Sequence, residues 1–252
     1  MRDHSADAGG DATLLDAKRF LREEVWAALG DAGVARFPGA AGRIPNFTGA
    51  EAAAERLRDV ERWKQARALK ANPDSPQWPV RQRALADGIV VYMAVPRLAG
   101  EEPFFLLDPE RIDTSPRKAS SIKGASAQGR TAPVEELEPV DLVVTGCVAV
   151  DRQGGRLGKG GGFSDLEFAL ASAAGLIGER TLVVTTVHPL QVLERGRIPM
   201  GGHDVPVDLV VTPDEVIVCD RAHPRPSGIA WDDLTDEKIA AIPLLARLAG
   251  SR

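Results

Sequence analysis

The residues best suited to chemistry lie in a glycine-rich run at residues 151–165, DRQGGRLGKGGGFSD. The run follows a strand-like apolar segment and precedes a helix-like segment at residues 166–177. Glycines in such a turn let backbone N–H groups approach a phosphate, and the helix N-terminus adds a favourable dipole. Arg156 and Lys159 supply positive charge, and Asp165 is a candidate ligand for a divalent ion. The pattern therefore predicts a loop that binds nucleotide phosphates.

This loop matches neither standard nucleotide-binding template. A P-loop has Ser or Thr after its lysine, whereas Gly160 follows Lys159 here, and a Rossmann fingerprint has its glycines directly after the first strand. On spacing alone, a structural role in tight backbone packing remains an alternative. The grouping of Arg156, Lys159 and Asp165 at a helix start favours phosphate binding, because ionisable groups have little structural reason to gather there.

Charged residues elsewhere are candidates for the same site. Lys18 and Arg22 lie four residues apart on a helix predicted at residues 16–29, so they share one face, which either meets solvent or binds phosphate. Asp208 begins a predicted strand, and we expect it near the carboxyl ends of the neighbouring strands. There it would join Asp165 in binding Mg²⁺, which commonly takes one or two carboxylates plus phosphate oxygens. Turn capping is the alternative role for Asp208.

The composition excludes several classes of function. The 252 residues are 44% hydrophobic and 27% charged, which is typical of globular proteins. A net charge of −5 argues against a general nucleic-acid or membrane-surface binder, because phosphate backbones and anionic lipids need a basic face. No leader segment and no run of about 18 apolar residues is apparent. We expect a cytoplasmic protein that binds a small molecule, without nucleic-acid or membrane partners, as a monomer or small homo-oligomer.

Isolated reactive residues have structural explanations. Cys147 and Cys219 lie in β-like runs without metal-ligand spacing, so we expect both to be small buried hydrophobic residues. His188 and His203 are candidates for general acid–base catalysis, but each stands alone in the sequence, which favours turn or packing roles.

The order of elements predicts an α/β fold. Residues 1–12 are polar and small and predict a disordered tail. Helices are predicted at residues 16–29, 49–71 and 80–87, and strands at 89–95, 141–150, 181–187, 208–212 and 215–219. Strands that alternate with helices imply a mainly parallel sheet with helices on both faces. We expect residues 13–252 to form a single α/β domain, with an insertion of a strand or two at about 97–139 and a C-terminal extension from about 221.

The glycine-rich run resembles the motif D-x-x-G-x-R-L-G-x-G-x-G-[YF]-Y-D of the 5-formyltetrahydrofolate cyclo-ligase family. Further motifs similar to the family's follow in order: K-x-x-x-R at Lys18 and Arg22, W-K-x-A at residues 63–66, and H-D-x-x-x-D at residues 203–208. The resemblance covers about residues 14–96 and 139–220. It implies a three-layer α/β/α sandwich of the NagB/RpiA-like kind, in agreement with the alternation of strands and helices.

By this resemblance the chain would use ATP and Mg²⁺ to convert 5-formyltetrahydrofolate, or a related N-formyl compound, to 5,10-methenyltetrahydrofolate with release of ADP and phosphate. The implied nucleotide contacts are Lys18, Arg22, Arg156, Leu157, Gly158, Lys159, Gly160, Gly161, Gly162, Phe163 and Ser164. The implied substrate contacts are Asp74, Lys159, Gly160, Gly161, Gly162 and Phe163. The implied catalytic residues are Arg156 and Lys159, and the implied metal ligands are Asp165 and Asp208.

The chain also departs from the family pattern. Phe163 and Ser164 stand where the family has a pair of tyrosines, and Asp74 stands where it has a substrate-facing glutamate. The residues for ATP and the metal are thus kept, whereas those around the pterin are altered. This asymmetry leaves two alternatives: an ATP-dependent reaction on another substrate, such as a thiamine-related compound, or a nucleotide- or folate-binding regulatory protein without turnover.

Overall fold

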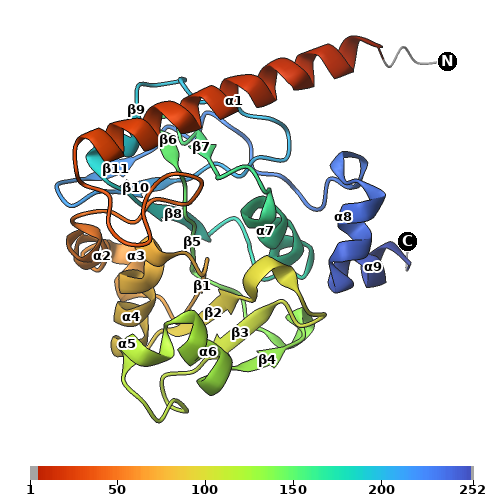
Figure 1. Ribbon diagram of the computed structural model, residues 1–252. Helices are drawn as coiled ribbons and strands as arrows, with labels where there is room; N and C mark the ends of the chain where they lie inside the picture. Colours follow the sequence, from red (N-terminus) through yellow and green to blue (C-terminus); the bar gives the residue numbers. More distant parts are fainter. Residues whose placement is uncertain (1–4, 251–252) are drawn as a thin grey trace.

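An eight-stranded mixed sheet forms the centre of the molecule (Figure 1). This computed structural model describes the backbone of residues 5–250 and the side chains of residues 13–250. The strands lie in the order β11 (Val216–Val218), β10 (Leu209–Val211), β8 (Leu182–Thr186), β5 (Leu142–Val144), β1 (Ala68–Ala71), β2 (Val90–Ala94), β3 (Phe104–Leu107) and β4 (Arg130–Ala132). The strands from β10 to β2 are parallel to one another, and β11, β3 and β4 are antiparallel to their neighbours. The parallel strands therefore end at one common edge.

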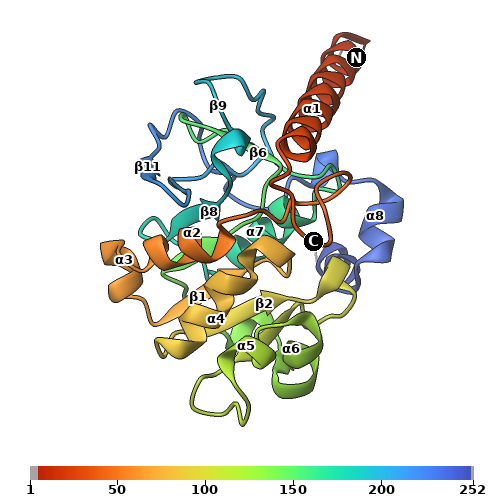
Figure 2. The ribbon, with the colours of Figure 1, turned by 60° about the vertical axis from the view of Figure 1, so that its left-hand side comes forward.

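Helices cover both faces of this sheet. In β1, Ala68 packs into an apolar cluster with α7 (Phe163–Ala173), whereas Leu69 packs into a second cluster with α2 (Ala50–Leu57) and α4 (Trp78–Ala86). Such alternation is expected because successive strand residues point to opposite faces. Figure 2 shows α2 and α4 grouped with the short helix α3 (Glu61–Lys64) along the sheet. The predicted three-layer α/β/α fold class is confirmed.

A small second sheet lies against helix α1 (Ser5–Asp31), which extends beyond the rest of the molecule (Figure 1). Its strands lie in the order β7 (Arg156–Leu157), β6 (Ala149–Asp151) and β9 (Val192–Leu193). Helix α1 buries Leu21, Val25 and Leu29 in a cluster that includes residues of β6 and β7. This packing holds Lys18 and Arg22, on the same helix, beside the glycine-rich run.

Three predicted elements differ from the structure. Helix α1 begins at Ser5, so the disordered tail predicted for residues 1–12 is wrong from residue 5 onward, and residues 1–4 lie outside the described residues. The helix predicted at 49–71 divides into α2, α3 and β1, because a short apolar run fits a helix and a buried strand equally well. The strand predicted at 141–150 divides into β5 and β6, which belong to different sheets.

The insertion and the extension both contribute regular elements. Residues 97–139 contain β3, β4, α5 (Pro116–Ala119) and α6 (Ile122–Gln128), and α8 (Asp236–Ala241) and α9 (Pro243–Ala249) lie in the extension. Both segments are packed against the body, since Ala119, Ala125, Leu244 and Leu245 are fully buried in the two main clusters. Within residues 5–250, no helix combines the length and the apolar character that crossing a membrane requires.

Gly154 lies in the turn between β6 and β7, with φ of +91°. A Cβ atom there would lie 2.4 Å from the carbonyl oxygen of Val207. We expect Gly154→Ala to lower the free energy of unfolding by about 3 kcal/mol, since the left-handed backbone costs about 1–2 kcal/mol and the overlap about 1–3 kcal/mol. Gly175→Ala is the matched control, because φ is +76° but the Cβ position is open, so only about 1–2 kcal/mol is expected. Urea unfolding measures both, and equal losses would contradict the clash.

Candidate nucleotide and substrate site

A cavity of about 310 Å³ opens at the carboxyl ends of β1, β2 and β5. Its lining includes residues 72–75 after β1, residues 96–97 after β2 and Gly146 after β5, together with much of the glycine-rich run. The chain leaves β1 first for β2 on one side and later returns to β5 on the other. Open α/β sheets bind ligands at such a reversal of strand order. The cavity is therefore the candidate site.

The structure divides the glycine-rich run into two parts with different roles. Gly154 and Gly155 shape the β6–β7 hairpin, which the sequence did not separate from the phosphate-binding loop. Residues 158–162, here called the glycine loop, lead into α7 and include residues that line the cavity. Gly162 is the N-cap residue of α7, with φ of +66°, and offers no side-chain cap. The first N–H groups of an uncapped helix are suited to bind an anion.

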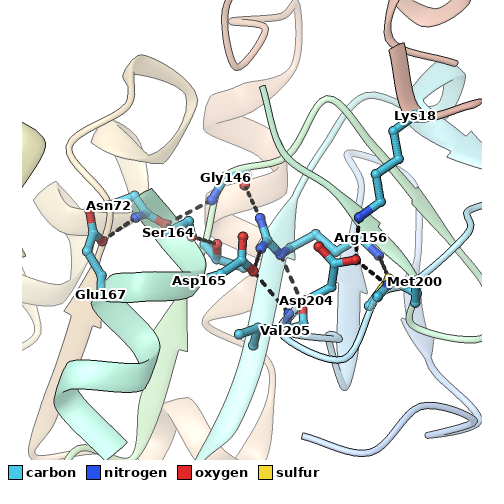
Figure 3. Close-up of polar contacts among 12 residues, drawn as sticks. Lys18, Asn72, Gly146, Arg156, Ser164, Asp165, Glu167, Met200, Asp204 and Val205 are labelled. Carbon is cyan, nitrogen blue, oxygen red and sulfur yellow. Dashed lines mark hydrogen bonds and ion pairs between the residues drawn. The ribbon is translucent and has the colours of Figure 1, made fainter. Parts of the chain in front are cut away.

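Arg156 forms the centre of a buried polar network (Figure 3). Its guanidinium forms an ion pair with Asp165 and donates to the carbonyl oxygens of Val205 at 3.0 Å and Gly146 at 3.3 Å. Burial opposes the charge on Arg156, but Asp165 raises the pKa of the guanidinium above its usual value. Burial likewise opposes ionisation of Asp165, yet the charge of Arg156 and the amide of Val205 hold the pKa of this carboxyl below its usual value. Both groups are therefore charged.

Asp204 brings a second carboxylate to this network. It forms an ion pair with Lys18 of α1 and accepts a hydrogen bond from the amide of Gly201 at 2.6 Å. The amide of the next residue, Val205, donates to Asp165 at 3.0 Å. Figure 3 shows the two carboxylates on either side of the Arg156 guanidinium. The Arg156 guanidinium thus lies between two carboxylates, next to the glycine loop.

Further cations border the glycine loop. The Nε atom of Arg22 donates to the carbonyl oxygen of Gly158 at 2.7 Å, so α1 is fastened directly to the loop. Lys159 is exposed and lines the cavity. Burial raises the pKa of Asp74, and the positive charge of Lys159 opposes that rise. Of the four predicted cations, Arg156 and Lys159 line the cavity, whereas Lys18 and Arg22 lie behind the glycine loop outside this lining.

Asp208 does not join Asp165, so this part of the predicted metal site is not formed. Its carboxylate accepts a hydrogen bond from the amide of Val183 at 2.7 Å and forms ion pairs with Arg221 and Arg225. Because β10 is parallel to β8, its first residues lie at the edge of the sheet opposite the cavity. The expected position of Asp208 at the carboxyl ends is therefore wrong, and the second carboxylate near Asp165 is that of Asp204, on the other side of Arg156.

The other predicted contacts divide into two groups. Leu157 is 1% exposed and packs in the core beneath α1, so its side chain does not line the cavity. Phe163 and Ser164 line the cavity in the first turn of α7. The hydroxyl of Ser164 lies 2.7 Å from that of Thr145 and 3.4 Å from Oδ1 of Asn72, and so faces the floor of the cavity.

The cysteines and histidines have the structural roles expected of them. Cys147 and Cys219 are free and buried, and burial raises the pKa of Cys147 to about 11, which keeps the thiol protonated. His188 caps a short helix at residues 189–191. His203 pairs with Asp233 at 2.9 Å, outside the cavity lining.

The sequence analysis missed two polar residues that line the cavity, Asn72 and Glu167, and two buried polar residues near this lining, Lys70 and Gln77. Glu167 accepts hydrogen bonds from Nζ of Lys70 at 2.5 Å and from Nδ2 of Asn72 at 2.6 Å, and all three side chains are buried. Burial raises the pKa of Glu167, although Lys70 opposes the rise. Oε1 of Gln77 is buried without a hydrogen-bond partner among the described residues. A polar Lys70 inside the apolar run 68–71 was the available signal, but it was hidden by the incorrect helix prediction.

Comparison with known proteins gives consistent matches. The model of the 5-formyltetrahydrofolate cyclo-ligase family matches residues 14–213. A methenyltetrahydrofolate synthase domain-containing protein of Bos taurus is 35% identical over 234 residues, which are 92% of this chain and 62% of that protein. A mitochondrial 5-formyltetrahydrofolate cyclo-ligase of Arabidopsis thaliana is 39% identical over 82 residues, 32% of this chain and 30% of that protein.

One solved structure supports the fold. The NMR structure of Aquifex aeolicus 5,10-methenyltetrahydrofolate synthetase aligns with a TM-score of 0.51 and 21% identity, over 82% of this chain and 95% of that chain. The chain thus spans nearly the whole of this structure but less than two thirds of the Bos taurus relative.

Proposed function

The chain belongs to the 5-formyltetrahydrofolate cyclo-ligase family, and on that basis we propose that it is an ATP- and Mg²⁺-dependent enzyme. It converts 5-formyltetrahydrofolate, or a related N-formyl compound, to the cyclised methenyl product and releases ADP and phosphate. One observation carries this proposal: Arg22 and Arg156 lie against the glycine loop, next to Asp165 and to the ion pair of Lys18 with Asp204. Phosphoryl transfer consists mainly of positioning and charge neutralisation, which such a cluster supplies.

The nucleotide would lie on the glycine loop. Its phosphates would accept hydrogen bonds from the uncapped N-terminus of α7 and face the charges of Lys18, Arg22 and Lys159. In this arrangement Arg156 and Lys159 are the proposed catalytic residues, since both line the cavity and would stabilise negative charge on the transferred group. No side-chain nucleophile is needed.

Asp165 and Asp204 suit Mg²⁺, which commonly takes one or two carboxylates and completes its shell with phosphate oxygens and water. Among the residues that the structure describes, no group of three or more His, Cys, Asp or Glu side chains could hold a metal by itself. In the structure Asp165 pairs with Arg156 and Asp204 pairs with Lys18, so the proposed metal would share these carboxylates with the two cations. Bound Mg²⁺ would neutralise phosphate charge at this point.

The formyl-bearing substrate would occupy the cavity next to the nucleotide. Asp74, Asn72 and Glu167 offer acceptors that suit the N–H groups of a pterin ring, and Phe163 offers an apolar wall. The formyl oxygen attacks the γ-phosphorus of ATP and ADP leaves. The neighbouring nitrogen then closes the ring on the formyl carbon and loses its proton, and phosphate leaves with the former formyl oxygen. In this proposal the glycine loop binds the nucleotide, and the residues of the cavity floor bind the formyl-bearing substrate.

Arg22 provides a test of the nucleotide position. We expect Arg22→Met to raise the Kd for ATP–Mg²⁺ about tenfold, equivalent to about 1.4 kcal/mol, because one charge-assisted phosphate contact is lost. Arg19→Met is the matched control, since Arg19 is exposed on the same helix and pairs with Asp16. Isothermal titration calorimetry measures both constants. An equal change in both variants would contradict the assignment.

A second candidate function has a specific observation in its favour. The tyrosines of the family motif are replaced by Phe163 and Ser164, which line the cavity, and the Ser164 hydroxyl lies 2.7 Å from that of Thr145. An altered floor fits an ATP-dependent reaction on a different substrate, of which a thiamine-related compound is one example.

Thermal-shift titration separates the candidates. Stabilisation by both ATP–Mg²⁺ and 5-formyltetrahydrofolate is the result expected for the folate reaction. Stabilisation by ATP–Mg²⁺ alone favours the second candidate, and folate binding without ADP formation favours a regulatory protein.

A further inference from the structure

The C-terminal extension, residues 221–250, is packed onto helix α7. It lies beyond the span that the family model matches, residues 14–213. Leu244 and Leu245 are fully buried and share an apolar cluster with Leu166 of α7. Figure 1 shows α8 and α9 beside α7. Because the extension is anchored in the core, it holds fixed positions relative to the start of α7.

Helix α8 brings Lys238 to the glycine loop. The Nζ atom donates to the carbonyl oxygen of Gly161 at 3.3 Å and lies 5.8 Å from the ring centroid of Phe163, within range of a cation–π contact. The same ammonium would lie 3.0 Å from a Cβ atom at Gly162, where φ is +66°. Lys238 thus contacts Gly161 and Phe163 and leaves little room for a side chain at Gly162, and all three residues line the cavity.

The extension also contacts the turn that carries Asp204. Oδ2 of Asp233 lies 2.9 Å from Nδ1 of His203, the residue just before Asp204. A small cavity between these contacts is lined by Lys238, His203 and Asp233 and by residues of α7. Gly162 and Asp165 line both this cavity and the candidate site, so the extension adjoins the site directly. One packed segment therefore holds both the glycine loop and the second carboxylate.

We propose that the extension is part of the nucleotide site and that Lys238 is a positioning residue, which fixes the glycine loop in its phosphate-binding conformation. This inference rests on the proposed function. A backbone with glycine at 158, 160, 161 and 162 loses much conformational freedom when it is ordered. Contacts that order it before binding improve affinity without touching the ligand.

Hydrogen–deuterium exchange and ATP–Mg²⁺ titration together test this role. Lys238→Met keeps the side-chain length and removes the charge, and Lys238→Arg restores it. We expect Lys238→Met to speed exchange at residues 158–163 in the free protein at least threefold and to raise the Kd for ATP–Mg²⁺ three- to tenfold. Lys238→Arg should return both quantities to within twofold of the unsubstituted protein. Glu237→Gln, at an exposed position of α8, is the matched control and should change neither.

The two measurements separate the possible failures. Unchanged exchange in Lys238→Met would overturn the positioning role. Faster exchange with an unchanged Kd would overturn the link between the loop and the nucleotide. If the unsubstituted protein fails to bind ATP–Mg²⁺, the proposed function fails, and the exchange measurement still decides whether Lys238 orders the loop.

Discussion

We expect Asp204→Asn to lower kcat/KM for the ATP-dependent cyclisation about 1,000-fold, whereas Asp208→Asn changes it less than about threefold. The first figure corresponds to about 4 kcal/mol of transition-state stabilisation, the scale of a metal contact to phosphoryl oxygens. Asp204 lies beside Asp165 and the glycine loop, while Asp208 is held by Arg221 and Arg225 at the opposite edge of the sheet. Initial rates across a Mg²⁺ titration at saturating ATP measure the difference.

Asp204→Asn loses one ion pair and Asp208→Asn loses two, so each variant needs a folding control. Asp204→Asn leaves Lys18 without its partner, and Asp208→Asn leaves two arginines without theirs. Rates should be compared at a temperature at which circular dichroism shows both variants folded. A larger loss in Asp208→Asn, or a Mg²⁺ dependence unaltered in Asp204→Asn, would contradict the placement of the metal.

The second large effect is on stability. We expect Arg156→Met to lower the free energy of unfolding at pH 7 by about 3 kcal/mol, because it leaves the largely buried carboxylate of Asp165, 15% exposed, without its partner. The carbonyl oxygens of Gly146 and Val205 also lose a donor. Urea unfolding gives the value. Arg152→Met is the control: its ion pair with Glu215 is exposed, so we expect a change below about 1 kcal/mol.

The same substitution predicts a pH dependence. In the unsubstituted protein, burial raises the pKa of Asp165, but the charge and hydrogen bond of Arg156 outweigh burial and hold this pKa below its usual value. Its ionisation therefore stabilises the fold above the unfolded-state pKa of about 3.9 and ceases to do so as the pH falls through the lower folded-state value. Without Arg156, burial favours the neutral acid, so the deficit of Arg156→Met should shrink toward pH 4. A deficit that stays constant from pH 7 to 4 would show that this ion pair is not its cause.

The parts of the site formed by residues close together in the sequence could be predicted, and the parts formed by distant residues could not. The glycine loop and the Lys18–Arg22 pair were accessible because their residues are neighbours in sequence, and a fixed spacing places them on one turn or one helix face. The structure then brought α1 onto the loop through the bond from Arg22 to Gly158.

The remaining parts depended on tertiary geometry. The choice between Asp204 and Asp208 required the direction of β10 relative to the cavity, which no spacing reveals. Glu167 looked like one residue of an apolar helix until β1 placed Lys70 against it. Lys238 is 77 residues from Gly161 in the sequence and belongs to no motif. Its contact with Gly161 therefore could not be predicted without the packing of the extension on α7.

The most direct test of the central claim is formation of the methenyl product from 5-formyltetrahydrofolate by the purified protein. The product is followed by absorbance, and ADP is measured in the same reaction. We predict equal amounts of methenyl product and ADP, formed only when ATP and Mg²⁺ are both present. Absence of the methenyl product, under conditions in which an authentic cyclo-ligase forms it and this protein binds ATP–Mg²⁺, would contradict the folate reaction.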